Sequence, residues 1–158
     1  KIDRPQRFSN ICPALYGFIP KTLCDIEVGN LCMEKTGLKN IIGDQDPLDV
    51  CILTEKRIDR NGILVNAIPI GGFRMIDNNQ ADDKIICVLN GDDVYESWSD
   101  INDIPTGLLN RLKHYFLTYK NLPDDASQKV HISSIYGAAE AKEVIQRSIN
   151  DYNKVYEQ

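Results

Sequence analysis

The sequence has no apolar run approaching the roughly 20 residues that span a membrane. Its N-terminus also lacks the basic region, apolar core and small-residue cleavage site of a secretory signal. Positive charge is scarce: 18 Lys and Arg are outnumbered by 23 Asp and Glu, which gives a formal net charge of -5. Without a basic stripe, the chain is a poor match for proteins that bind nucleic-acid phosphates. We therefore expect a cytoplasmic protein with neither a nucleic acid nor a membrane as partner.

The five cysteines are odd in number and form no Cys-x-x-Cys pair, so they provide no recognisable thiol motif. Cys51 and Cys87 lie inside apolar runs, where a thiol acts as a small hydrophobe. These features predict a reducing compartment, and a disulfide between Cys24 and Cys32 is the alternative.

The length of 158 residues predicts a single domain, residues 1–158, of the α+β class and mainly β. Strands are predicted at 48–54, 62–70, 72–76 and 84–89, each bounded by Gly, Asn or Asp turns. Closely spaced strands with little helix between them predict antiparallel pairing in a small barrel. Flanking helices are predicted at about 105–120 and 137–155, and a short helix within the excursion 24–40 should end at Gly37.

Residues 43–49, Gly-Asp-Gln-Asp-Pro-Leu-Asp, place three carboxylates directly ahead of the apolar run 50–53. Asp44 and Asp46 share one side of an extended backbone, and Pro47 suggests a bend that turns Asp49 toward the same point. Two such charges ~5 Å apart repel by ~3 kcal/mol at an effective dielectric of ~20. The stretch must therefore be open to water or hold cations.

A second acidic group, Asp77, Asp82 and Asp83, precedes Lys84 at the start of a predicted strand. Either acidic group alone reads as a solvated turn, because Asp is common in turns. If both lie at one mouth of the barrel, five of their carboxylates, all but that of Asp83, suit Mg²⁺ or Mn²⁺. An EF-hand calcium loop over residues 44–55 is a weaker interpretation, because Leu48 and Asp49 stand where a ligand and a glycine belong.

Other catalytic motifs are missing from the sequence. It has no Gly-rich P-loop and no Gly-x-Ser-x-Gly elbow, and His114 and His131 have no metal-ligand spacing. On spacing alone, Tyr119 is a core residue, Lys120 a cation at a helix C-terminus and Arg4 an ordinary surface cation.

Residues 44–50 nevertheless resemble the signature of the soluble (family I) inorganic pyrophosphatases, in which Asp, a small or polar residue, Asp, Pro, an apolar residue, Asp and an apolar residue follow one another. Further segments resemble that family in the same order, namely residues 3–4, 16–22, 77–84 and 119–120. The likeness extends from residue 3 to about 147.

The resemblance implies an OB-like five-stranded antiparallel barrel with two flanking helices, assembled as a homo-oligomer. It implies hydrolysis of pyrophosphate to two phosphates by a metal-activated water, without a covalent intermediate, using several Mg²⁺ ions for which Mn²⁺ or Zn²⁺ could substitute. The positions that match are, for metal binding, Asp44, Asp49, Asp77 and Asp82; for proton transfer from the attacking water, Asp46; and for binding of the substrate, Arg4, Tyr16, Lys84, Tyr119 and Lys120.

Three departures limit this transfer of roles. Cys12 stands where many members have a second tyrosine, and the excursion 24–40 is longer than in compact bacterial members. Members also have a segment before the Asp-Arg pair that supplies a phosphate-binding Lys and metal-site Glu residues, and we expect this domain to lack that segment. The alternatives are a catalytically weakened OB-fold module that binds phosphate or metal, and a calcium-binding interaction protein.

Overall fold

The computed structural model describes residues 11–121 and 130–157. Seven strands form one mixed sheet, in the order β1-β3-β6-β4-β5-β2, and β7 pairs with β4. The strands are β1 (Leu15–Phe18), β2 (Ile42–Gly43), β3 (Asp49–Leu53), β4 (Ala67–Asp77), β5 (Gln80–Ala81), β6 (Lys84–Leu89) and β7 (Val130–Gly137).

The centre of the sheet is formed by β3, β6 and β4, which lie side by side. β4 and β6 are antiparallel, as expected for strands joined by a short hairpin. β6 lies between β3 and β4, however, and it runs in the same direction as β3, with which it pairs in parallel. This arrangement places Asp49, the first residue of β3, directly opposite Lys84, the first residue of β6.

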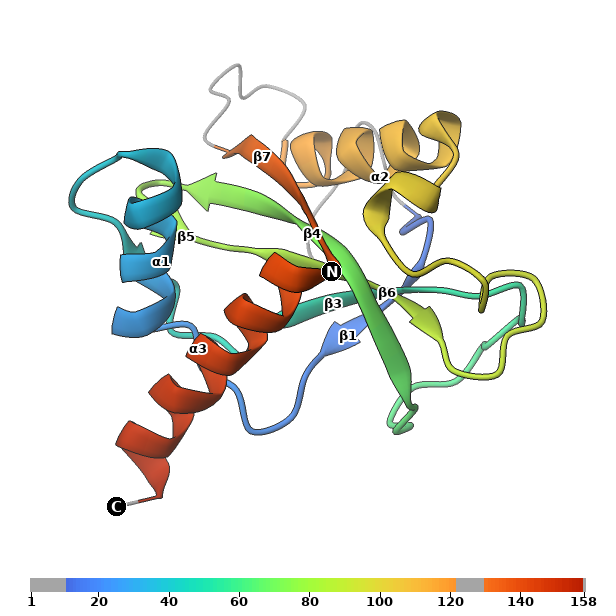
Figure 1. Cartoon of the computed structure of the whole chain (residues 1–158), viewed down its shortest axis with the longest axis horizontal. Helices are drawn as coiled ribbons and strands as arrows, with labels where there is room; N and C mark the ends of the chain where they lie inside the picture. The colour runs from blue at the N-terminus through green and yellow to red at the C-terminus, as the bar shows by residue number, and fades with distance from the viewer. Residues whose placement is uncertain (1–10, 122–129, 158) are drawn as a thin grey trace.

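In the described residues, three α-helices cover the sheet: α1 (Ile26–Thr36), α2 (Thr106–Thr118) and α3 (Ala138–Tyr156). A short 3-10 helix, η1 (Ile101–Asp103), precedes α2. Figure 1 shows α3 crossing the sheet beside α1, with α2 apart from both. Successive side chains of β3 and β6 point to opposite faces of the sheet and so belong to two different cores. Val50 and Ile85 pack in the core with α1 and α3, whereas Cys51 and Ile86 pack in the core with α2.

The α+β, mainly β class and both flanking helices are confirmed. The short helix is also confirmed, since α1 is followed by Gly37 with a φ of 73°. The prediction of purely antiparallel pairing is wrong, because β3–β6 and β2–β5 are parallel. The pairing pattern does not join the sheet into a ring, so closure of the barrel stays a prediction.

The predicted strands 62–70 and 72–76 are in fact one long strand, β4, which begins at Ala67. The break between them was predicted at Gly71, because Gly, Asn and Asp turns were expected to bound each strand. A Cβ on Gly71 would lie 2.5 Å from the carbonyl oxygen of Tyr136, and one on Gly72 would lie 2.6 Å from the Tyr136 ring. The pair therefore serves the close approach of β7 to β4 rather than a change of direction. Among the described residues, no helix is long and apolar enough to cross a lipid bilayer.

Candidate active site

The predicted site residues of β3, β4 and β6 lie on the face of the sheet that α2 covers. Side chains two residues apart in a strand point to the same face. Asp49 therefore lies on the face of Cys51, and Lys84 on the face of Ile86, which is the face of the core with α2. Asp77 ends β4, and α2 delivers Lys120 just beyond its last turn. Three strands and one helix thus bring together residues that are far apart in sequence.

Carboxylates and lysines alternate along this site. Lys84 Nζ lies 2.6 Å from Asp49 Oδ2 and also contacts Asp82 Oδ1. Lys120 Nζ lies 2.6 Å from Asp77 Oδ2 and 3.3 Å from Asp82 Oδ2. The result is one continuous chain of opposite charges, from Asp49 through Lys84, Asp82 and Lys120 to Asp77.

Both lysines are held in the charged form. Burial opposes the charge of Lys84, whose side chain is 1% exposed, but Asp82 and Asp49 together outweigh burial and raise its pKa. Burial likewise opposes the charge of Lys120, and Asp82 and Asp77 raise the pKa of that ammonium group. The carboxylates therefore hold two ammonium groups at this site. Without these cations, the carboxylates would repel one another.

Asp44 joins the cluster beside Asp82. Burial raises the pKa of Asp44 to about 7, while the backbone N–H of Asp46 opposes the rise and the charge of Asp82 adds to it. That N–H donates to Asp44 Oδ1 at 3.1 Å. A carboxyl group whose proton affinity rises beside a neighbouring carboxylate marks an anionic position suited to a cation.

The bend in the acidic stretch occurs at Gln45 rather than at Pro47, where sequence analysis placed it. Gln45 has a φ of 67°, and its N–H donates to the carbonyl of Cys24 at 3.0 Å, while the carbonyl of Asp46 accepts from Cys24 N–H at 2.9 Å. This bend leaves Asp44 half-buried in the cluster and Asp46 exposed. The Asp46 carboxylate accepts no hydrogen bond from the described part of the chain.

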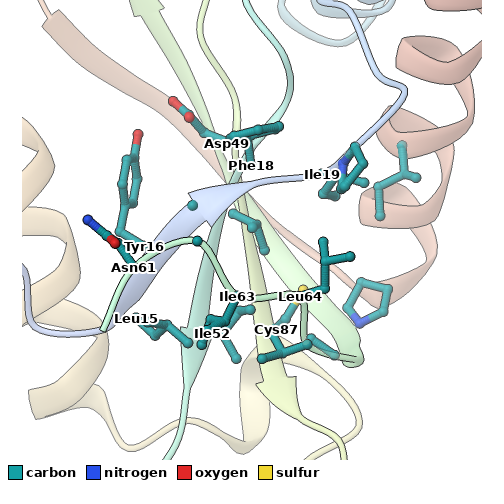
Figure 2. Close-up of a pocket in the computed structure, with 18 of the residues that line it drawn as sticks. Leu15, Tyr16, Phe18, Ile19, Asp49, Ile52, Asn61, Ile63, Leu64 and Cys87 are labelled. Atoms are coloured by element: carbon teal, nitrogen blue, oxygen red, sulfur yellow. The ribbon is translucent and has the colours of Figure 1, made fainter. Parts of the chain in front are cut away.

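The two predicted tyrosines border the same cluster. Figure 2 shows the Tyr16 hydroxyl and the Asp49 carboxylate pointing to the same side of β1. Burial first, and then Asp49 through its charge and a hydrogen bond, raise the pKa of Tyr16. Lys120 Nζ lies 5.6 Å from the centroid of the Tyr119 ring, and burial raises the pKa of Tyr119 as well.

Cys12 lies beside Tyr115, whose ring stacks on that of Tyr119. The thiol of Cys51, the backbone of Ala14 and the hydroxyl of Tyr115 stabilise its thiolate and lower its pKa to about 7, against the effect of burial. All five cysteines are free thiols, including Cys24 and Cys32. The prediction for Arg4 lies outside the described residues.

A cavity of about 930 Å³ lies beneath β1 and the segment 60–65, next to Asp49. Figure 2 shows that Ile52, Ile63, Leu64 and Cys87 form much of its wall. Because this wall is mainly apolar, the cavity offers few partners to a small anion. The carboxylate–lysine cluster at its edge is the better candidate for chemistry.

The donor set of the cluster fits a hard divalent cation, since it consists of carboxylate oxygens. Within the described ranges, however, no three His, Cys, Asp or Glu side chains converge closely enough to hold one ion. Lys84 and Lys120 lie between the acids and supply the positive charge instead. A metal bound here would take over contacts that these ammonium groups make, and the lysines would then be available to anionic oxygens.

Clustered carboxylates and lysines at the ends of the central strands of an α+β fold suit an enzyme that acts on phosphate anions with metal ions. The family model for inorganic pyrophosphatase matches residues 1–153. The chain belongs to the inorganic pyrophosphatase family, whose members are metal-dependent.

Individual relatives agree with this assignment. The chain is 48% identical over 160 residues to an inorganic pyrophosphatase of Chlamydia muridarum, covering 99% of this chain and 77% of the relative. It is 49% identical over 156 residues to the inorganic pyrophosphatase of Chlamydia caviae, covering 96% of this chain and 72% of that relative. The crystal structure of an inorganic pyrophosphatase from Neisseria gonorrhoeae superimposes with a TM-score of 0.75 at 30% identity, covering 97% of this chain and 77% of that one.

Proposed function

We propose that this chain is an inorganic diphosphatase that hydrolyses pyrophosphate to two phosphates with Mg²⁺, by direct attack of water and without a covalent intermediate. The observation that carries the proposal is the continuous chain of charges from Asp49 to Asp77, with lysines at alternate positions. An acidic protein can bind an acidic substrate at such a place once cations neutralise its carboxylates.

The residues divide into three roles in this proposal. Asp44, Asp49, Asp77 and Asp82 hold the metal ions; Lys84, Lys120, Tyr16, Tyr119 and Arg4 bind phosphate oxygens; Asp46 accepts the proton of the attacking water. Bound metal supplies positive charge for the phosphate oxygens and lowers the pKa of the attacking water. The exposed Asp46 carboxylate, with no partner among the described residues, is open to that water.

Lys84 and Lys120 position phosphate oxygens in this proposal. Their raised pKa values keep them cationic throughout the physiological range. Two fixed cations hold the equatorial and leaving-group oxygens, which lowers the barrier by orientation and by electrostatic stabilisation of the developing charge. We further infer a homo-oligomer in a reducing, cytoplasmic environment; five free thiols are compatible with the latter.

The test is phosphate release from pyrophosphate by the purified protein, with Mg²⁺ and with a chelator. Release in Mg²⁺ that the chelator abolishes is the expected result. Phosphate binding in Mg²⁺ without release would instead support the weakened binding module, and Mn²⁺ or Zn²⁺ in place of Mg²⁺ would show which ion serves best.

A further inference from the structure

Asp83 lies between two site residues but faces the other way. In an extended chain, successive side chains point to opposite faces, so Asp83 points away from the side shared by Asp82 and Lys84. Its side chain is 2% exposed and contacts Tyr136, which belongs to the core shared with α1 and α3. The residue has no place in the charge chain from Asp49 to Asp77, and sequence analysis gave it no role.

A built set of contacts holds the Asp83 carboxylate. The Tyr136 hydroxyl donates to Asp83 Oδ2 at 2.9 Å, and Arg74 Nη2 lies 3.4 Å from the same oxygen. Arg74 also donates from Nη1 to Glu140 Oε1 at 2.7 Å and lies 5.0 Å from the centroid of the Tyr136 ring. Gly72 makes room for that ring, because a Cβ there would lie 2.6 Å from it.

Stability alone explains this network poorly. Both members of the Arg74–Asp83 pair are buried, with side chains 1% and 2% exposed. Buried ion pairs commonly stabilise no better than apolar residues of the same size, because desolvation offsets the attraction. Moreover, Asp83 Oδ1 and Arg74 Nε are buried and find no hydrogen-bond partner among the described residues. What the network does provide is a fixed orientation for the Asp83 carboxylate, through its contacts with Tyr136 and Arg74.

The residues on both sides of Asp83 are fixed in the sheet. Asp82 N–H donates to the carbonyl of Met75 at 3.0 Å, which closes the hairpin, and Lys84 begins β6 opposite Asp49. A carboxylate pinned between them prevents this segment from rotating or slipping by one residue, a change that would exchange the faces of its side chains.

We infer that Asp83, held by Tyr136 and Arg74, is a positioning residue that aims Asp82 and Lys84 into the active site from the opposite face of the sheet. The inference rests on the proposed function for its effect on turnover. Its effect on the local backbone is independent of that function.

The test compares Asp83→Asn, which keeps the shape but removes the charge, with Tyr136→Phe, which removes only the hydroxyl. We expect kcat for pyrophosphate to fall about tenfold or more in the first variant and less in the second, and the Mg²⁺ concentration for half-maximal activity to rise, because small misplacements of reacting groups are costly. In metal-free protein, hydrogen exchange should accelerate in the peptide covering residues 78–85 and stay unchanged elsewhere.

Asp92→Asn is the matched control, since Asp92 is a buried acid that accepts hydrogen bonds from Thr54 and from the backbone of 55, 94 and 95, outside the site. It should lower the melting temperature while leaving kcat and the Mg²⁺ requirement unchanged. Equal losses of kcat in this control and in Asp83→Asn, at equal melting temperatures, would overturn the inference.

The two proposals can fail separately. If the unaltered protein releases no phosphate, the proposed function fails, and local exchange at 78–85 alone decides the positioning role: faster exchange supports it and unchanged exchange refutes it. If Asp83→Asn does not fold, Tyr136→Phe decides by the same criteria.

Discussion

Lys84 Nζ lies 2.6 Å from Asp49 Oδ2, although 35 residues separate the two in sequence. The contact exists because β3 and β6 pair in parallel with these residues opposite each other. The same ammonium group also contacts Asp82, so a single side chain bridges a carboxylate of β3 and one in the turn between β5 and β6.

Lys84→Met should therefore destabilise the protein by about 3–5 kcal/mol, the usual effect of removing one partner from a buried ion pair. Urea unfolding without metal measures the loss, and saturating Mg²⁺ should reduce it by restoring positive charge. Lys142→Met, at an exposed position of α3, is the control and should unfold like the unaltered protein. A Lys84→Met deficit that Mg²⁺ leaves unchanged would contradict this account.

Gly43 opens the acidic stretch and admits no larger residue. A Cβ at this position would lie 2.0 Å from the carbonyl oxygen of Cys24. Since this neighbour is backbone, Gly43→Ala must displace the stretch that carries Asp44. We expect the free energy of unfolding to fall by about 1–3 kcal/mol and most of the activity to be lost. Gly107→Ala, where nothing lies within 4 Å of the new Cβ, should keep or slightly raise the melting temperature, and equal behaviour of the two variants would disprove the steric argument.

Local chemistry made part of the fold predictable. Residues 84–89 were predicted as a strand from a continuous apolar run, and the observed β6 has the same bounds. The α2 helix was predicted from its apolar spacing and from Pro105, which is its N-cap. These features depend on periodicity and capping, which a short window of sequence contains.

Long-range pairing was not predictable in the same way. Nothing within β3 or β6 indicates that β6 inserts between β3 and β4, and the assumption that neighbours in sequence pair led to the wrong strand direction. The acids of the site were predicted from their clustering and from the family resemblance. Their neutralisation by Lys84 and Lys120 was not predicted, because it depends on where α2 and β6 meet.

Cys12 should be the reactive thiol of the protein. Cys51, Ala14 and Tyr115 lower its pKa to about 7. Burial, in contrast, raises the pKa of Cys32 to about 11 and that of Cys87 to about 12. A thiolate forms above its pKa, so alkylation by iodoacetamide should be about tenfold faster at pH 8 than at pH 6. Peptide mass mapping checks this, and Cys12→Ser should remove the fast phase; labelling of a buried thiol at the same rate would contradict the prediction.

Mg²⁺ should stabilise the folded protein even without substrate, because it relieves repulsion among the carboxylates of the site. At a concentration of about 100 Kd, a ligand that binds only the folded state contributes about 2.7 kcal/mol. In a domain of this size, that corresponds to a rise in melting temperature of roughly 5–10 °C. NaCl at the same ionic strength is the control, and an unchanged melting temperature in Mg²⁺ alone would count against metal binding at this site.

Asp46 is the residue whose replacement should separate chemistry from structure. Its carboxylate is exposed and, in the described residues, supports no other side chain, so Asp46→Asn should leave the melting temperature and Mg²⁺ binding close to those of the unaltered protein. Loss of a general base lowers turnover by about 10² or more, and kcat for phosphate release should fall accordingly. Asp93→Asn, at another exposed acid, is the matched control and should keep full kcat. Normal turnover in Asp46→Asn would show that the attacking water gives its proton to a different group.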